Sequence, residues 1–298
     1  MNVDIAAAVS FLAAHGRTLD RRRLALLLGE GDGDAVLAAL DGYRNADGGY
    51  GWGIEPDLRS PESQPAGAMH AFEVLAELAA AGSVAGHRAV ALCDWLDRCT
   101  LPDGGLPFTL PVTDPAGCSP IWLGSDHETA SLQMTAQVAA NAQLVARHDR
   151  QVADHPWLAR ATSWCCDAIA GLDSAPDAYA LLFAVRFLDV VPEADALLER
   201  LGRFLPPDGV VTVAGGTPEE ALRPLDFAPR AAGAARRLFA ADVIAAELDR
   251  LADRQQPDGG WTVDFASSSP AAALEWRGYA TVAAVIALRP ELRQIGSR

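Results

Sequence analysis

The chain has 298 residues, of which 50% are hydrophobic, and a formal net charge of −15 at pH 7. This composition is sufficient for a large core, whereas the acidic balance excludes a basic nucleic-acid-binding face and disfavours an anionic membrane surface. All 24 Lys+Arg positions are arginine, which excludes a P-loop lysine and a Schiff-base lysine. We expect residues 1–298 to form one domain.

Amphipathic periodicity predicts helices along the chain. The first helix carries Ile5, Ala8 and Leu12 at helical spacing, and Asp20 is predicted to cap the second. Stretches rich in Pro and Gly separate the elements. The helices expected after the first cover residues 20–28, 34–43, 66–81, 86–99, 129–147, 156–171, 176–189, 193–204, 231–254 and 279–288.

No convincing alternating strand pattern is found, and only residues 210–213 read as a short extended piece. The five cysteines are expected to be reduced, with Cys165 and Cys166 packed inside a helix. Asp4 interrupts the N-terminal apolar stretch, and no uncharged apolar run reaches about 18 residues. The sequence therefore favours a cytoplasmic protein without a transmembrane segment.

An Asp-Gly-Gly-hydrophobe turn recurs along the chain. Its three full copies begin at Asp47, Asp103 and Asp258, and a weaker copy begins at Asp208. The interval between the second copy and the weak one is about twice the others, as if one copy had decayed. Repeats of this length are typical of stacked helical units.

The order of helix, glycine turn, polar loop and helix predicts antiparallel helical hairpins. At about 50 residues per hairpin, the chain accommodates five or six of them. Such an array either stays open as a solenoid or closes into a ring with inner and outer helices around a central cavity. The expected fold class is all-α, as an α/α-toroid.

The last turn is the fullest copy. It places Leu251 in a helix, then Gln255 and Gln256, the two glycines and Trp261. A glutamine at this point can hydrogen-bond the end of a neighbouring helix, and the tryptophan can cover that contact. The motif resembles the QW repeat of terpenoid cyclases and protein prenyltransferases over about residues 40–290. That resemblance implies an α/α-toroid whose apolar central cavity binds isoprenoid chains.

Polar segments follow the turns, and the resemblance implies that these loops face the mouth of the cavity. Acidic residues near helix starts also serve as ordinary partners of the helix dipole, so a structural role stays open for each carboxylate. The candidate site residues are Trp52, Glu55, Asp57 and Arg59, then Trp122, Asp126, His127 and Glu128, then Asp226 and Phe227, and finally Asp264, Phe265, Glu275, Trp276, Arg277 and Tyr279.

The sharpest resemblance involves the Asp-x-Asp-Asp-Thr-Ala motif of class II terpene cyclases, which lies at a helix start and whose central Asp protonates an alkene or epoxide. Aligned on Thr129-Ala130, this chain has His127 at the acid position, between Asp126 and Glu128. Either carboxyl could replace the acid if burial raised its pKa. The alternative is that Asp126 caps the helix and His127 lies on the surface.

Two further segments carry paired charges. Pro56 is expected to hold its segment extended, so that Glu55 and Asp57 project as a fixed pair. This pair could act as acid and base, bind a cation, or form a charged turn with Arg59. In the C-terminal segment, Glu275 and Arg277 are expected to form an ion pair.

No metal site is predicted. Asp97-Arg98-Cys99 matches the Asp-x-Cys zinc motif of protein prenyltransferases, but it precedes a turn, whereas the motif of that family starts a helix. No cofactor is expected, although Mg²⁺ could take part if the substrate is a diphosphate.

The resemblance implies a terpenoid-cyclase-like enzyme that cyclises an isoprenoid or other apolar substrate by carboxylic-acid-initiated chemistry. A non-catalytic lipid-binding toroid is one alternative. A carbohydrate-active toroid enzyme, with Glu55, Asp57 or Asp126 as acid and base, is another. The expected partner is a small apolar substrate, and a homodimer is compatible with the sequence.

Overall fold

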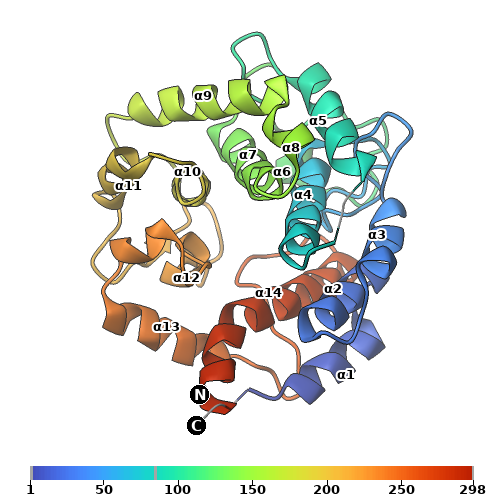
Figure 1. Cartoon of the computed structure of the whole chain (residues 1–298), viewed down its shortest axis with the longest axis vertical. Coiled ribbons are helices and arrows are strands. Elements are labelled where there is room, and N and C mark those ends of the chain that lie inside the picture. Colours follow the sequence, from blue (N-terminus) through green and yellow to red (C-terminus); the bar gives the residue numbers. More distant parts are fainter. Residues whose placement is uncertain (1–2, 84–85, 297–298) are drawn as a thin grey trace.

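The computed structural model describes residues 3–83 and 86–296 and shows the expected all-α fold (Figure 1). Strand in this part of the chain is confined to β1 (Val211–Thr212) and β2 (Ala221–Leu222), which pair antiparallel. The extended piece predicted over residues 210–213 contains β1, whereas β2 was not predicted. The helices are α1 (Ile5–His15), α2 (Thr18–Leu28), α3 (Gly33–Asp41), α4 (Pro65–Ala80), α5 (His87–Cys99), α6 (Pro120–Leu123), α7 (Leu132–Ala146), α8 (Arg150–Ala153), α9 (Pro156–Ala170), α10 (Ala178–Leu188), α11 (Asp195–Gly202), α12 (Pro224–Phe227), the 3₁₀ helix η1 (Ala234–Leu238), α13 (Ala241–Asp253) and α14 (Pro270–Gly296).

The recurring turn has the same geometry in each full copy. The first glycine has a positive φ, between 92° and 101°, which a side chain would oppose. The aspartate accepts a hydrogen bond from the backbone N–H two residues further on, at 2.9–3.1 Å. This short-range cap holds the reversal closed. The weak copy keeps both features, at Gly209 and Asp208.

Gln255 performs the role that the repeat predicts for it. Its side-chain amide donates to the backbone carbonyl of Asp4, and its amide oxygen accepts from the backbone N–H of Asp4, both at 2.8 Å. Asp4 is the N-cap of α1. Trp261 is buried and donates its indole N–H to the carbonyl of Leu251 at 2.7 Å. The last turn therefore fastens the C-terminal part of the chain to the start of the first helix.

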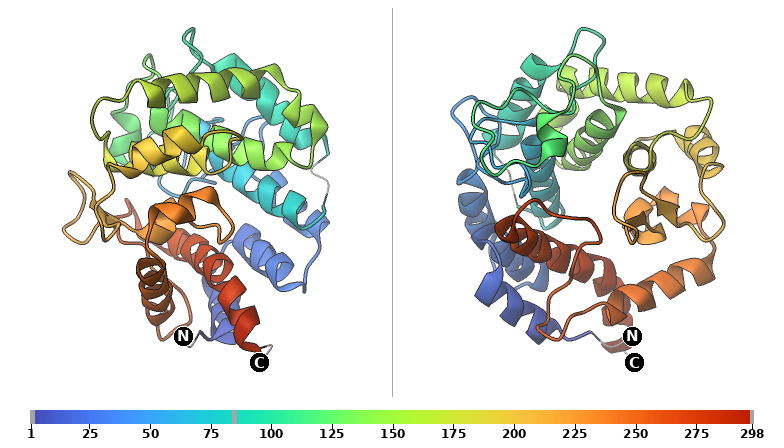
Figure 2. Two further views of the ribbon diagram at one scale, coloured as in Figure 1. Left: turned by 60° about the vertical axis from the view of Figure 1, so that its left-hand side comes forward. Right: turned by 180° about the vertical axis from the view of Figure 1, so that it is seen from behind.

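Helix contacts largely follow the chain order. One series runs from α4 to α7, α10 and α12, and a second from α5 to α9, α11 and η1. The last helix, α14, contacts α1, α2 and α13, so the two ends of the chain pack together. Figures 1 and 2 show the helices following one another around the middle of the view, with α1 and α14 side by side.

The core consists of two adjoining clusters. The larger is built mainly from α4, α5, α7, α9 and α10, and the smaller joins α1, α2, α13 and α14. Ile244 packs against both. Cys165 is fully buried and Cys166 half-buried, and all five cysteines are free thiols.

Several predicted boundaries are wrong for identifiable reasons. The helix expected over 231–254 is broken at Phe239, whose extended backbone inserts its ring against Phe227. The last helix begins at Pro270 instead of 279, because proline is well suited to the first turn of a helix. Asp20 does not cap α2, which already begins at Thr18.

One helix of the described chain, over Pro270–Arg289, is long and apolar enough to cross a membrane by length and composition alone. Its Val282, Val285 and Leu288 are buried in the smaller core cluster. Core helices pass the same test, so the structure contains no clear membrane-spanning segment.

Candidate functional site

The loop after the first Asp-Gly-Gly turn does not run extended as predicted. The backbone N–H of Leu58 donates to the carbonyl of Glu55 at 3.0 Å, so Glu55–Leu58 is a β-turn. Pro56 occupies its second position, which the fixed φ of proline suits. The turn directs Glu55 and Asp57 inward, where the two residues are 3% and 7% exposed.

Glu55 contacts a histidine that the sequence did not indicate. His70, in α4, places Nε2 2.9 Å from a carboxylate oxygen of Glu55 and Nδ1 3.1 Å from one of Glu73. Each ring nitrogen therefore faces an acceptor, and only the imidazolium can donate to both. Burial opposes the charge, but the two carboxylates outweigh it and raise the pKa of His70 to about 9. The same arrangement lowers the pKa of Glu73 against its burial.

Asp57 holds the C-terminal segment in place. One carboxylate oxygen accepts from the Ser267 hydroxyl and from the backbone N–H and hydroxyl of Ser268, at 2.6–2.9 Å. The other accepts from the indole N–H of Trp276 at 2.7 Å. Burial would raise the pKa of Asp57, but these hydrogen bonds prevail and lower it. Asp57 is therefore an ionised carboxylate, and both of its oxygens accept hydrogen bonds.

Two aromatic rings, those of Phe265 and Tyr279, and the His70 ring pack edge to face around Trp276. Its ring centroid lies 5.0 Å from that of Phe265, 5.4 Å from that of Tyr279 and 6.0 Å from that of His70. The Tyr279 hydroxyl donates to Glu73 at 2.9 Å, and burial raises the pKa of this phenol. We call Glu55, Asp57, His70, Glu73, Phe265, Trp276 and Tyr279 the aromatic–acidic cluster.

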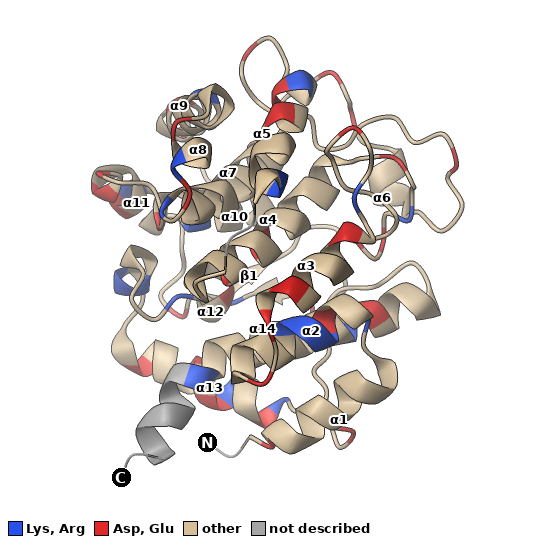
Figure 3. Ribbon diagram, turned by 45° about the vertical axis from the view of Figure 1, so that its right-hand side comes forward, with Lys and Arg blue, Asp and Glu red and all other residues tan. Residues whose placement is uncertain are grey.

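Charged residues of α2 support the cluster from one side. Arg23 forms two hydrogen bonds with Glu77 of α4, at 2.6 and 2.9 Å, and lies 5.6 Å from the ring centroid of Tyr279. Asp20, predicted as a helix cap, is fully buried between Arg17 and Arg23. Figure 3 shows the basic residues of α2 among acidic residues of neighbouring segments.

The predicted ion pair between Glu275 and Arg277 does not form. Residues two apart on a helix do not face each other. Glu275 instead pairs with Arg59 at 2.8 Å, and Arg277 pairs with Asp258 of the last repeat turn at 2.7 Å. Arg59 therefore does not form a charged turn with its neighbours Glu55 and Asp57.

The segment that resembles the class II motif lies apart from any helix start. Helix α7 begins at Leu132 with Ser131 as its N-cap, so Asp126 caps no helix. Asp126 and Glu128 are exposed, and the Asp126 side chain accepts from the Glu128 backbone N–H at 2.7 Å. This segment lacks the burial that a protonated carboxyl requires.

The aromatic and imidazole side chains beside that segment point elsewhere. Nδ1 of His127 lies 3.2 Å from the Thr109 carbonyl, and Trp122 stacks on Phe108 with ring centroids 4.7 Å apart. Trp52 is 58% exposed, and its indole N–H donates to Asn45 at 2.7 Å.

The remaining predicted residues follow the weak and the last turns. Asp226 closes the first turn of α12 by accepting from the Arg223 backbone N–H at 2.7 Å, and burial raises the pKa of its carboxyl. Phe227 is fully buried and belongs to the core. Asp264 forms an ion pair with Arg254.

Sequence reasoning missed His70, Glu73, Arg23 and the buried role of Asp20. A signal existed in α4, because His70 and Glu73 are spaced three apart in a largely apolar helix and must share a face.

The described residues contain no group of three or more His, Cys, Asp or Glu arranged to hold a metal ion. In the zinc-like string, Asp97 pairs with Arg160.

No protein-family model matches the chain, and the search of curated proteins finds no match either. Among solved structures, the chain is similar to the crystal structure of a protein from Actinoplanes. The two share 17% sequence identity with a TM-score of 0.57, over 96% of this chain and 97% of the other. At this identity, the similarity supports the fold alone.

Proposed function

We propose that the helices form an α/α-toroid, in which α2, α4, α7, α10, α12 and α14 make the inner layer. The serial helix contacts, the packing of α14 against α1 and α2, and the repeated glycine turn support this arrangement. In it, α2, α4 and α14 are neighbouring inner helices, and the aromatic–acidic cluster lies where they meet.

The proposed function is that of a terpenoid-cyclase-like enzyme acting on an isoprenoid or other apolar substrate through a cationic transition state. The observation that carries the proposal is the aromatic–acidic cluster. Aromatic faces and fixed carboxylates both stabilise a developing positive charge, and more strongly where water is excluded. Glu73, Trp276 and Tyr279 keep partial exposure, and we propose that a substrate reaches the cluster from this side.

Such chemistry needs a carboxyl that stays protonated. Asp57 is ionised, and Asp126 and Glu128 are exposed, so we assign the proton donor to Asp226, whose pKa is raised by burial. Arg186 donates to the backbone carbonyl of Asp226 at 2.5 Å, and its charge only partly offsets the effect of burial on the pKa of this carboxyl. Carboxyls in such environments serve as general acids.

The test is product analysis by gas chromatography and mass spectrometry after incubation with squalene-type olefins and prenyl diphosphates. Asp226→Asn, which keeps an acceptor for the Arg223 N–H, should abolish products. The matched change in an exposed carboxyl, Asp126→Asn, should leave turnover unchanged. Absence of any product with the wild-type protein, or full turnover by Asp226→Asn, would count against the proposal. Co-purified lipid without product would favour the non-catalytic binding protein.

One observation favours a second candidate, a carbohydrate-active toroid enzyme. Sugars commonly stack on exposed tryptophans, and Trp52 is 58% exposed beside the loop that carries Glu55 and Asp57. Release of reducing sugar from oligosaccharides, lost in Glu55→Gln, would support this candidate over the first.

The first proposal also places the protein in the cytoplasm, acting on a small apolar substrate as a monomer or homodimer. Mg²⁺ enters only if that substrate is a diphosphate.

A further inference from the structure

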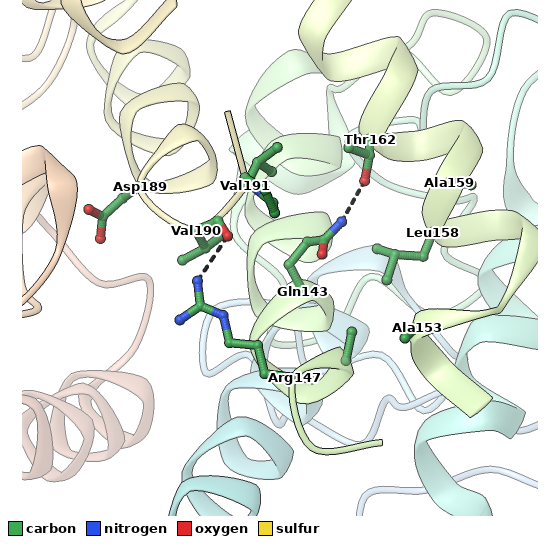
Figure 4. A pocket seen from close by; sticks show the side chains of 11 residues that line it. Gln143, Arg147, Ala153, Leu158, Ala159, Thr162, Asp189, Val190 and Val191 are labelled. Carbon is green, nitrogen blue, oxygen red and sulfur yellow. Dashed lines mark hydrogen bonds between the residues drawn. The ribbon is translucent and has the colours of Figure 1, made fainter. Parts of the chain in front are cut away.

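A pocket lies away from the aromatic–acidic cluster, between α7, α9 and the segment that follows α10 (Figure 4). Its volume is about 470 Å³, within the range of about 300–1,000 Å³ typical of small-molecule sites. Ala146, Leu158, Val191 and Pro192 supply apolar walls. None of the residues in the aromatic–acidic cluster lines it.

The polar side of this pocket carries the cation Arg147. The carboxylate that also lines the pocket, Asp189, is already hydrogen-bonded to other groups. Arg147 donates to the backbone carbonyl of Val190 at 2.9 Å and remains open to solvent. The lining carboxylate, Asp189, accepts from Arg230 at 2.9 Å and from the backbone N–H of Ala235 at 2.7 Å. In Figure 4, the Asp189 side chain points away from the Arg147 guanidinium.

The surroundings of Arg147 disfavour its charge. Burial and the charge of Arg230 lower the pKa of Arg147, and Asp189 only partly offsets them. Arg147 nevertheless stays a cation, because a guanidinium does not lose its proton in proteins, and it can attract an anion into the pocket.

The other polar groups suit the same kind of ligand. The Gln143 side-chain amide donates to the Thr162 hydroxyl at 2.9 Å, so the hydroxyl proton remains free to donate toward the pocket. Arg147 and Thr162 thus offer donors on opposite sides of Gln143, and apolar side chains line other parts of the pocket. One positive charge matches a monoanion, whereas a phosphate dianion would add uncompensated charge to a protein of net charge −15.

We propose that this pocket binds an organic monocarboxylate with an apolar body, with Arg147 holding the carboxylate. The site is independent of the proposed enzymatic function, because it shares no residue with the aromatic–acidic cluster.

The test uses octanoate as the probe, with 1-octanol and inorganic phosphate as comparison ligands. Isothermal titration calorimetry and ¹⁵N chemical-shift mapping on the whole protein should show saturable octanoate binding, with shifts confined to the residues that line the pocket. 1-Octanol lacks the charge and phosphate lacks the apolar body, so each should bind at least about tenfold more weakly.

Arg147→Met should weaken octanoate binding at least about tenfold. Arg150→Met provides the matched control, since Arg150 lies on the adjacent α8 with its side chain 91% exposed, and should bind octanoate as the wild type does. Ala159→Phe adds a bulky ring at an exposed lining position, leaves the arginine itself unchanged and should abolish binding. Circular dichroism establishes that each variant is folded. Octanoate that fails to saturate the wild type, or that binds Arg147→Met and Ala159→Phe with unchanged affinity, overturns the proposal.

Discussion

Asp57 and Trp276 are 219 positions apart, yet the indole N–H donates to the carboxylate at 2.7 Å. With Ser267 and Ser268 on the other oxygen, this carboxylate joins the first polar loop of the chain to the segment that opens the last helix. A single ionised side chain thereby positions both Trp276 and the loop that carries Phe265.

Asp57→Asn should lower the free energy of unfolding by about 1.5–3 kcal/mol. The substitution replaces one accepting carboxylate oxygen by a donating NH₂ group, which would then face another donor without a hydrogen bond. Urea denaturation at pH 7 measures this. Asp126→Asn changes an exposed carboxyl and should shift stability by less than about 0.5 kcal/mol. Equal stability of the two variants would contradict the role given to Asp57.

The same residue predicts a response to acid. The hydrogen bonds lower the pKa of Asp57 in the folded protein below its ordinary value of 3.8. The contribution of ionised Asp57 to the free energy of unfolding is therefore complete above pH 3.8. It is lost as the pH falls through the lowered pKa of the folded protein. The stability difference between wild type and Asp57→Asn should shrink in that acid range. A difference that stays constant down to pH 2 would exclude this linkage.

His70 predicts a response at the alkaline side. Its pKa is raised from 6.5 to about 9 by Glu55 and Glu73, with Arg23 and Tyr279 also facing Glu73. Protonated His70 therefore stabilises the folded protein, and this contribution, on the order of 3 kcal/mol, is complete below about pH 6.5. It is lost as the pH rises to about 9. Unfolding curves of wild type and His70→Gln should therefore converge between these values.

NMR titration of the His70 ring measures the same pKa directly. His148→Gln changes an exposed histidine and is the control variant for the measurement on His70→Gln. A His70 that titrates at or below pH 7 would contradict the imidazolium bridge.

Gln255→Ala should detach the start of α1 from the last turn. It removes the two hydrogen bonds to Asp4, at a cost of about 1–3 kcal/mol. Hydrogen exchange should speed up at the first amides of α1, including Ala7 and Ala8. The neighbouring Gln256 side chain bonds only the nearby Arg254 carbonyl, so Gln256→Ala should leave exchange in α1 unchanged.

Gly259→Ala tests the repeated turn. Gly259 has a φ of 92°, and an added Cβ would lie 2.2 Å from the Ala7 carbonyl oxygen. Gly82 has a similar φ of 80°, but an added Cβ there would meet nothing within 4 Å. Gly82→Ala should therefore cost about 1–2 kcal/mol from backbone strain alone, and Gly259→Ala clearly more, above about 3 kcal/mol. Thermal or urea unfolding compares them, and equal costs would show that close packing at the turn is unimportant.

Features that depend on local chemistry were predictable from the sequence. Helical periodicity identified most helices within a few residues, because the buried face of a helix recurs every 3.6 positions. The Asp-Gly-Gly turns were predictable because a positive φ and an aspartate cap act within three residues. Even the contact of Gln255 with a helix end followed from the repeat.

Pairings between distant residues were less predictable. Asp20 is of a residue type that commonly caps helices, but two arginines within the packed interior bind it instead. Glu275 and Arg277 are close in sequence, but α14 directs them to opposite partners, Arg59 and Asp258.

The amino-acid sequence determined by itself that this protein is helical, where its chain reverses, and that Glu55, Asp57, Trp276 and Tyr279 carry polar or aromatic chemistry. Only the tertiary structure decided that these residues meet around His70. Helix periods and turns arise from interactions within a few residues of the chain, whereas the charge state of His70 depends on two carboxylates that folding brings to its two ring nitrogens.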